Sequence, residues 1–339
     1  MSVRRSDYQQ VLHKAALEAG CELRLGQKVI DIKEAIPAVQ LQDGTSVHGD
    51  IVVIADGNFA SLLVLIASTI ILTTPGIKST LRQMIIPEED TAALSQPLST
   101  YRAWAPMDAL NTDKQVAELL SQPATNVWLG PGRHMIVYPA EGGKILAING
   151  TYPSRNDSAG EWNKAASVDE IQQRFHDFDP VAKAILSQAR DCKSWALAEV
   201  PRLPRWRSKS GKVVLIGDAA HGMLQFLAQG AAMATEDAGA LAECVNGLGP
   251  DGDIPGAMYY YERSRKWRGE RVQSQARRNG EFIHMPDGEE QEHRDRKLAG
   301  NPLPTDQDVD CGPLLDPKFT SWLYGHDTIR HTRHVLAEF

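Results

Sequence analysis

The sequence of 339 residues contains only four cysteines, and they stand far apart. Cys21, Cys192, Cys244 and Cys311 form no CxxC pair, and no histidine accompanies them at the spacing of metal ligands. These residues therefore exclude a disulfide framework and a zinc-finger type of site. We expect free thiols in an intracellular protein and no bound metal.

The sequence also lacks an excess of basic residues. Lysine and arginine number 36 against 43 acidic residues, which gives a formal net charge of −7. Proteins that bind nucleic acid usually carry a basic surface, so we expect no nucleic-acid partner. The opening residues, MSVRRSDYQQVL, are charged and lack the apolar core of a signal peptide. The expected location is the cytoplasm.

Long apolar runs are also rare, and the one present is short for a membrane span. Between Phe59 and Leu72 nearly every side chain is apolar, but Ser61, Ser68 and Thr69 interrupt the run. A helix that crosses a bilayer needs roughly 20 apolar residues. We therefore expect no stable membrane span, and a core helix is the alternative within a folded domain.

Strand and helix patterns alternate in the first part of the chain. Ser6 is expected to cap a helix that Gly20 closes. A DG turn at Asp43 and Gly44 precedes the apolar strand pattern DIVVIADG at 50–57. Strands and helices that alternate in this way predict an α/β fold.

The middle of the chain has a different pattern. The runs TNVWLG, RHMIVYP and KILAING read as strands, and two amphipathic helices are expected near 168–176 and 180–189. This combination predicts a second layer built on an antiparallel sheet. A charged helix from about 254 to 280 follows later, and after it comes a Pro-rich, polar C-terminal segment.

The run VVLIGDAAH combines a buried strand with a candidate ligand site. Gly217 allows a tight turn after the strand, and Asp218 follows at the strand end, where α/β sheets bind ligands. A helix then starts at Gly230 and Ala231, which leave its N–H groups accessible to an electron-rich group. A carboxylate and a bare helix N-terminus suit a polyhydroxyl linker followed by an anion. The alternative is a close helix–strand contact that merely needs small residues.

These residues carry a resemblance to a known family. GDAAHGMLQFLAQGAAMATEDAGALA resembles the second flavin-binding motif of single-component FAD-dependent aromatic monooxygenases, the salicylate hydroxylase-like group. WALAEVPRLPRWRS upstream, and YYERSRKWRGERVQSQARRNG, HMPDGEEQEHRD and WLYGHD downstream, are similar too. The resemblance covers essentially the whole chain except the inserted apolar stretch. It implies FAD as cofactor, with NADH or NADPH as co-substrate.

The resemblance also implies a division of the chain. Residues 1–90 and 191–285 correspond to a discontinuous Rossmann-like FAD-binding domain, in which 58–76 is expected to be an insert. Residues 91–190 correspond to a substrate-binding β-sheet domain, and 286–339 to a C-terminal extension. The family's opening βαβ unit with G-x-G-x-x-G has no counterpart here, which suggests an N-terminally truncated gene product.

The cofactor-binding residues implied by the resemblance are five. Asp218 corresponds to the residue that binds the ribityl chain, and the backbone of Gly230 and Ala231 to the part that faces the flavin pyrimidine. Arg5 corresponds to an FAD-contacting arginine, and Asp56 belongs to the motif ADG. Gln225 departs from the family, which usually has proline there, and the change is expected to loosen that loop.

The resemblance further implies two substrate residues. Arg102 of TYRAW and Tyr138 of GRHMIVYPA stand where the family has an active-site arginine and tyrosine. A cation and a phenolic donor would favour the ionised form of a phenol, which makes its ring electron-rich. The alternatives are an exposed strand charge for Arg102 and a packed strand residue for Tyr138.

The implied function is insertion of one oxygen atom of O2 into a small phenolic or polyketide-type aromatic substrate. One alternative is an inactive remnant that binds no flavin. Another is a related FAD-dependent epoxidase that acts on an isoprenoid double bond. The sequence makes no prediction of an oligomeric state.

The apolar stretch separates two parts of one motif of the family. ADG at 55–57 and IKSTLR at 77–82 would be continuous without residues 58–76. Glycine codons at both edges, Gly57 and Gly76, are compatible with splice sites. The sequence therefore favours a retained intron that has been translated as protein.

Three weaker signals have simpler interpretations. GLGPDG at 247–252 follows a helix and is expected to be a loop. His221 is expected to support its loop rather than to act as a base. The run ERSRKWRGERVQSQARR is expected to be a solvated helix face rather than a patch for RNA or anionic lipid.

Overall fold

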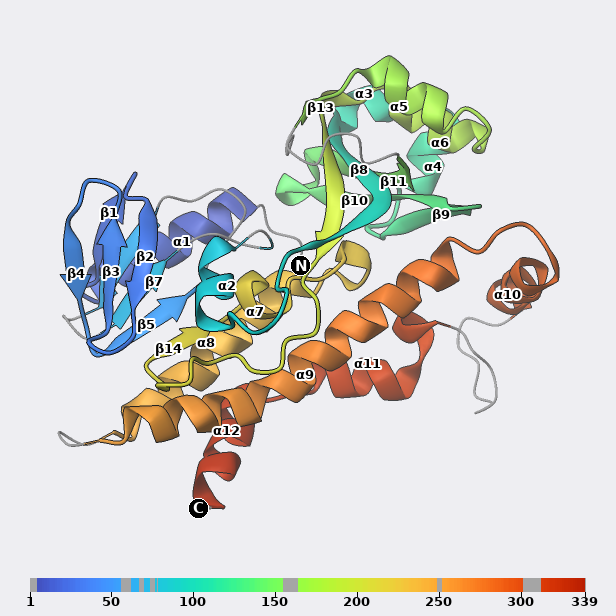
Figure 1. Cartoon of the computed structure of the whole chain (residues 1–339). Coiled ribbons are helices and arrows are strands. Elements are labelled where there is room, and N and C mark those ends of the chain that lie inside the picture. The colour runs from blue at the N-terminus through green and yellow to red at the C-terminus, as the bar shows by residue number, and fades with distance from the viewer. Residues whose placement is uncertain are drawn as a thin grey trace. The chain divides into compact units, whose positions relative to one another are not determined.

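A computed structural model describes residues 5–55, 62–66, 70–73, 77, 79–154, 164–248, 252–300 and 312–338. The chain forms two compact units (Figure 1). The first consists of Met1–Leu12, Ser95–Leu197 and Gly280–Cys311, and the second of His13–Leu94, Ala198–Asn279 and Gly312–Phe339. The domain boundaries inferred from the sequence remain a prediction.

The first unit is built on a six-stranded sheet. Its strand order is β12-β13-β8-β11-β10-β9, and the pairs β8–β11, β10–β11, β9–β10 and β12–β13 are antiparallel. The strands are β8 (Leu94–Pro106), β9 (Asn126–Gly130), β10 (Arg133–Ala140), β11 (Ile145–Pro153), β12 (Lys164–Ala165) and β13 (Arg190–Glu199). Its helices are α3 (Met107–Leu110), α4 (Lys114–Leu119), α5 (Val168–Arg174), α6 (Pro180–Ser187) and α10 (Glu289–Gly300).

Helices cover one face of this sheet, as Figure 1 shows for α3 to α6. Ser167 and Glu170 form a capping box at the start of α5, and Asp179 caps α6. Phe175, the C-cap residue of α5, and Ile185 of α6 are completely buried in the core. The two helices predicted near 168–176 and 180–189 from their amphipathic pattern are confirmed.

The second unit contains a five-stranded sheet of order β1-β6-β7-β5-β14 and a three-stranded sheet of order β2-β3-β4. The strands are β1 (Glu22–Leu25), β2 (Val29–Lys33), β3 (Ala38–Leu41), β4 (Ser46–His48), β5 (Ile51–Ile54), β6 (Leu62–Ile66), β7 (Ile70–Thr73) and β14 (Val213–Leu215). The helices are α2 (Thr80–Ile85), α7 (Asp218–His221), α8 (Gly230–Asn246), α11 (Pro317–Tyr324) and α12 (Thr328–Ala337). Two more helices, α1 (Arg5–Glu18) and α9 (Ile254–Ile283), have residues in both units.

The apolar stretch contributes strands to this sheet rather than the core helix that was one alternative. β7 pairs in parallel with β5, with Ile51 opposite Ile70 and Ile54 opposite Thr73, and β6 pairs antiparallel with β7 and β1. β-Branched residues favour strands because their side chains fit the pleated surface. β5 therefore has β14 on one side and β7 on the other.

The ends of the chain differ from the prediction in two respects. α1 begins at Arg5, so Ser6 lies inside the helix instead of capping it, whereas Gly20 follows the helix with φ 84° as expected. The C-terminal segment contains α10, α11 and α12 where a polar segment was predicted. The carboxylates of Asp316 and Asp327 cap α11 and α12. These caps stabilise two helices whose apolar patterns in the sequence are short.

The longest helix, α9, is polar, and α11 packs beside it (Figure 1). Val272 and Ala276 of α9 form a buried cluster with Phe319 and Leu323 of α11. Among the helices in the described ranges, none has the length and apolar character needed to cross a membrane.

Candidate functional site

The loop after β14 places Asp218 at the carboxyl end of the sheet. Gly217 has φ 58° and ψ −140°, a backbone conformation that residues with a side chain rarely adopt. A Cβ at Gly217 would lie 3.2 Å from the Cβ of Ala234 in α8. Glycine thus permits both the turn and the close approach of α8, and the half-buried Asp218 starts α7.

The structure brings Asp218 and Gly230 together. A Cβ at Gly230 would lie 3.8 Å from Oδ1 of Asp218, and Gly230 and the exposed Ala231 are the first two residues of α8. The N–H groups in the first turn of a helix have no acceptor within that helix, and this end carries partial positive charge. A carboxylate beside a helix N-terminus free of bulky side chains fits a ligand that offers hydroxyl groups and then an anion.

A network of buried ionic side chains holds this loop in place. Asp237 of α8 accepts hydrogen bonds from the N–H of Gly217 (2.9 Å) and from Nε of Arg265 (2.8 Å), and its Oδ2 lies 2.5 Å from Nε2 of His221. Burial disfavours the charged form of His221, but the charge and hydrogen bond of Asp237 outweigh it and raise the pKa of His221. His221 is 1% exposed, which agrees with the prediction that it supports the loop.

The arginines of α9 correct one expectation. Arg265 and Arg268 are completely buried, although their run was predicted to be a solvated face. Both donate to Glu236 at 2.7 Å, and Arg268 also donates to the carbonyl of Leu323. The two arginines can be buried because the carboxylates of Glu236 and Asp237 in α8 neutralise their charges.

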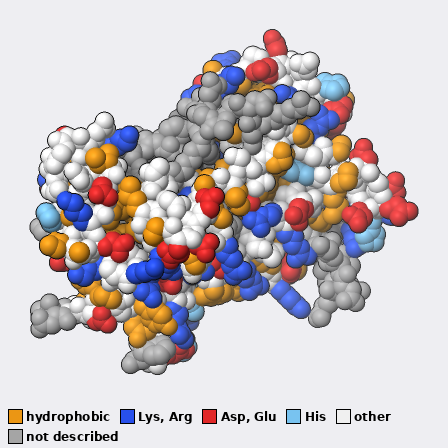
Figure 2. All heavy atoms as spheres, viewed as in Figure 1, with side chains coloured by type: hydrophobic (Ala, Val, Ile, Leu, Met, Phe, Trp, Pro, Cys, Tyr) orange, Lys and Arg blue, Asp and Glu red, His pale blue; other side chains and the backbone are white. Residues whose placement is uncertain are grey.

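Sequence reasoning missed this network, and the only signal was the spacing of the two arginines, one helical turn apart. Elsewhere on the face seen in Figure 2, basic and acidic side chains lie among one another.

The segment IKSTLR packs against the same loop. Ser79 caps α2 by accepting the N–H of Arg82 at 3.1 Å. The guanidinium of Arg82 is completely buried and donates to the carbonyls of Ile77 (2.8 Å), Thr91 (2.8 Å) and Ala219 (3.0 Å). Arg82 therefore fixes the backbone of α7 directly after Asp218.

The loop with the unusual glutamine is also held by a side chain. Residues Gln225–Leu227 form a short 3-10 helix, and Ala228 after it has φ 53°. Nδ2 of the buried Asn279 donates to the carbonyl of Phe226 at 2.8 Å. This hydrogen bond restrains the backbone between Asp218 and Gly230 without the proline of the related motif.

Arg102 and Tyr138 share one face of the six-stranded sheet. Arg102 of β8 pairs with Asn149 of β11, which pairs with Ile136 of β10, and Tyr138 lies two residues further along β10. Because alternate residues of a strand share a face, both side chains lie opposite the helix-covered side. They are two strand spacings apart, about 10 Å across the sheet.

Aromatic side chains accompany this pair. Trp104 pairs with Ala147, which pairs with Tyr138, so the three lie in one row on the same face. The guanidinium carbon of Arg102 lies 5.2 Å from the ring centre of Trp195 on β13, a cation–π distance. Arg102 and Tyr138 are both half-buried. This face can hold a planar ring and direct a cation and a phenol at it.

Two predicted residues cannot be placed in the site. Arg5 is the first residue of α1, and its side chain is outside the described part of the structure. Asp56 lies outside the described residues, as does the centre of the predicted loop at 247–252. Within the described ranges, no group of three or more His, Cys, Asp or Glu side chains could hold a metal ion.

Comparison with known proteins identifies the family. Residues 3–270 match the model of a family described as FAD binding domain. FAD-dependent monooxygenase OpS4 of Beauveria bassiana is 28% identical over 337 residues, which cover 98% of this chain and 73% of the relative. 3-Hydroxybenzoate 6-hydroxylase 1 of Aquipseudomonas alcaligenes is 30% identical over 330 residues, which cover 96% of this chain and 73% of the relative.

Solved structures share the fold. A salicylate hydroxylase substrate complex matches with a TM-score of 0.75 at 24% identity, over 98% of this chain and 75% of the other. CtdE in complex with FAD and a substrate matches with a TM-score of 0.74 at 19% identity, over 97% of this chain and 72% of the other. The predicted α/β fold with an antiparallel sheet, the flavoprotein resemblance and FAD as cofactor are confirmed. The chain belongs to the FAD-binding-domain family and is an enzyme of the FAD-dependent monooxygenase class.

Proposed function

We propose that this enzyme uses NADH or NADPH and O2 to hydroxylate a phenolic or polyketide-type aromatic substrate. The observation that carries the proposal is the face of the six-stranded sheet where Arg102, Tyr138 and two tryptophans, Trp104 and Trp195, lie together. Relatives named as 3-hydroxybenzoate hydroxylases and a hispidin-3-hydroxylase support an aromatic substrate. The same proposal includes the cytoplasm as the site of the reaction.

The cofactor fits the loop after β14. The carboxylate of Asp218 would accept hydrogen bonds from hydroxyl groups of the ribityl chain. The N–H groups of Gly230 and Ala231 would face the electron-rich end of the flavin ring, where the helix dipole favours negative charge. Bound FAD supplies the redox chemistry that activates O2.

The substrate face prepares the ring for reaction. A phenol that approaches Arg102 would be held with its oxygen toward the guanidinium, which favours the phenolate. The hydroxyl of Tyr138 would donate a hydrogen bond to an oxygen of the substrate. The tryptophans would contact the ring and exclude water, so that the cation acts in an environment of low dielectric constant.

The test is product analysis with the full chain loaded with FAD. A panel of phenols is incubated with NADH or NADPH under ¹⁸O2, and mass spectrometry looks for products that contain one labelled oxygen atom. We expect Arg102→Gln to lower kcat/KM by about a hundredfold, whereas Lys114→Gln on the exposed surface of α4 leaves it unchanged. A chain that binds FAD and yields epoxides from an olefin panel, but no hydroxylated phenol, would contradict the proposal.

A further inference from the structure

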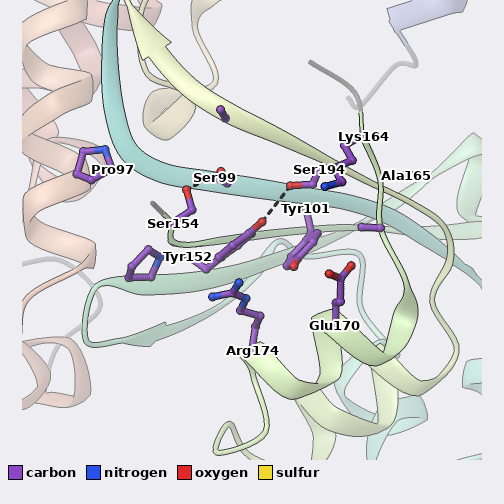
Figure 3. A pocket seen from close by; sticks show the side chains of 13 residues that line it. Pro97, Ser99, Tyr101, Tyr152, Ser154, Lys164, Ala165, Glu170, Arg174 and Ser194 are labelled. Atoms are coloured by element: carbon purple, nitrogen blue, oxygen red, sulfur yellow. Dashed lines mark hydrogen bonds between the residues drawn. The ribbon is translucent and has the colours of Figure 1, made fainter. Parts of the chain in front are cut away.

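A cavity lies in the first unit, on the face of the sheet opposite to Arg102. Its volume is about 720 Å³, and β8, β11, β13 and α5 contribute to its lining (Figure 3). Tyr101 lines it, whereas Arg102 is the next residue of the same strand and points to the opposite face. The cavity is therefore separate from the proposed substrate face, and its volume is in the range of small-molecule sites.

Two stacked aromatic rings form one wall of the cavity. The rings of Tyr101 and Tyr152 have centroids 4.4 Å apart and planes 15° apart. The hydroxyl groups of Tyr152 and Ser194 are 2.9 Å apart, as the dashed line in Figure 3 marks. Burial, together with the hydrogen bond to Tyr152, raises the pKa of Tyr101. Tyr101 thus remains a protonated hydrogen-bond donor at neutral pH.

Charged side chains line the cavity from two elements. Arg174 and Glu170 point from α5 toward the two rings (Figure 3), and Lys164 approaches from β12. The guanidinium carbon of Arg174 lies 4.7 Å from the ring centre of Tyr152. Glu170 already accepts the N–H of Ser167 at 3.1 Å. Two cations against one carboxylate, which also serves as a helix cap, leave the lining positive.

The rest of the cavity lining has an apolar part and a polar part. Two prolines and three alanines provide small apolar surfaces. The hydroxyls of Ser99 and Ser154 lie 2.7 Å apart at another part of the lining. A ligand that fits this arrangement has a planar ring, one negative charge and a polar substituent.

We propose that this cavity binds a small aromatic carboxylate as a second ligand, apart from the substrate of the reaction. The ring lies against the apolar residues beside the stacked tyrosines, and the carboxylate accepts hydrogen bonds from Arg174 and Lys164. Arg174 suits this role because its planar guanidinium can pair with a carboxylate through two N–H groups. A ring hydroxyl of the ligand is held by the Ser99–Ser154 pair.

Titration calorimetry of the full chain loaded with FAD tests the proposal with benzoate as the probe. We expect saturable binding of benzoate and binding of benzylamine that is at least about tenfold weaker, because a charge-assisted hydrogen bond is lost and replaced by repulsion. Arg174→Gln should weaken benzoate binding about tenfold. Lys183→Gln, an exposed cation of α6 outside the cavity, should leave it unchanged.

Two further variants make the result decisive. Tyr152→Phe keeps the stacked rings but removes the hydroxyl group that is hydrogen-bonded to Ser194. This variant should weaken benzoate binding less than Arg174→Gln does. Arg102→Gln changes only the opposite face and should retain the affinity for benzoate, which separates this site from the proposed function. The proposal is overturned if benzoate shows no saturable binding, or if Arg102→Gln abolishes binding while Arg174→Gln, folded by circular dichroism, does not affect it.

Discussion

Nε2 of His221 lies 2.5 Å from Oδ2 of Asp237, and both side chains are buried beneath the loop that carries Asp218. His221 comes from α7 and Asp237 from α8, so the contact joins the two elements that carry Asp218 and Gly230 of the proposed cofactor site. The second oxygen of Asp237 accepts a hydrogen bond from Arg265 of α9. One carboxylate thus fixes the positions of three helices.

Replacement of Asp237 with asparagine should destabilise the protein strongly. The variant removes the only carboxylate that Arg265 and His221 share and leaves Glu236 as the remaining carboxylate of Arg265. Breaking a buried pair typically costs about 3–5 kcal/mol. Denaturant unfolding of Asp237→Asn measures the loss, and the exposed variant Glu89→Gln should stay within about 0.5 kcal/mol of the unmodified protein. A loss as small as that of Glu89→Gln would show that the network contributes little to folding.

The stability of the protein should fall in mild acid because of a histidine pair in the first unit, of which His134 is buried and His284 half-buried. Nδ1 of His134 and Nε2 of His284 lie 2.6 Å apart. Burial, and for His134 also the neighbouring His284, lowers the pKa of His134 to about 3, and burial lowers the pKa of His284 to about 4. An unfolded histidine has a pKa of about 6.5, so below that pH the unfolded chain binds more protons than the folded one.

The contribution of this pair to stability is therefore full above about pH 6.5 and is lost as the pH falls toward the folded values. Between about pH 6 and 4, each such histidine increases the slope of the unfolding free energy against pH by at most about 1.4 kcal/mol per pH unit. Unfolding free energies measured across this range should show a smaller slope for His284→Asn. Equal slopes for the variant and the unmodified protein would argue against a buried neutral pair.

Flavin binding should depend on the carboxylate of Asp218. Asp218→Asn keeps the size of the side chain but replaces a charge-assisted acceptor, so FAD affinity should fall about tenfold to a hundredfold. Quenching of flavin fluorescence during titration measures the affinity. Asp287→Asn, an exposed carboxylate in the loop before α10, serves as the matched control. Equal FAD affinity in the two variants would remove Asp218 from the cofactor site.

Arg82 should be needed for the stability of the second unit. Arg82→Met fills similar space but leaves the buried carbonyls of Ile77, Thr91 and Ala219 without this donor, a loss on the order of 3 kcal/mol. Arg82→Lys should recover only part of the loss, because an ammonium group lacks the planar fork of the guanidinium. Thermal unfolding of both variants, with the exposed Arg330→Met as control, gives the comparison. Full recovery by lysine would mean that charge alone matters.

Gly150 should not tolerate even a methyl group. A Cβ at this position of β11 would lie 2.8 Å from ring atoms of Phe175, the C-cap residue of α5, so the helix or the ring must shift. Overpacking of this kind costs about 1–3 kcal/mol, which we expect for Gly150→Ala in a denaturant titration. Gly247→Ala provides the control, since a Cβ there meets nothing within 4 Å. An unchanged Gly150→Ala variant would show that α5 can move away from the sheet at little cost.

Local features of the fold could be predicted because their causes are contained in a few neighbouring residues. The turn at Asp43 and Gly44 has Gly44 at φ 87°, and Oδ1 of Asp43 accepts the N–H of Thr45 at 2.9 Å. The caps at Ser167 and Asp179 likewise act within one helical turn. The motif around Asp218 and Gly230 combined such local signals, and the structure brings the two residues together.

Features that depend on distant partners could not be predicted. The burial of Arg265 is a consequence of Asp237, which lies on another helix, and charge patterns along one helix do not reveal such a partner. The cavity of the first unit likewise requires Tyr101, Tyr152 and Arg174 from three separate elements. Composition alone could not decide whether the apolar stretch forms a helix or strands, because strand pairing with β5 depends on residues outside the stretch.

The parallel pairing of β5 with β7 gives individual amide protons a diagnostic value. The N–H of Val52 donates to the carbonyl of Lys212 on the β14 side, so the N–H of Val53 points toward β7, since successive residues of a strand direct their amides to opposite edges. Hydrogen exchange at Val53 therefore reports on the apolar stretch, while exchange at Val52 reports on β14. In a protein translated from a transcript without the codons for residues 58–76, the amide of Val52 would stay protected from hydrogen exchange. The amide of Val53 would lose its protection unless another strand took the place of β7.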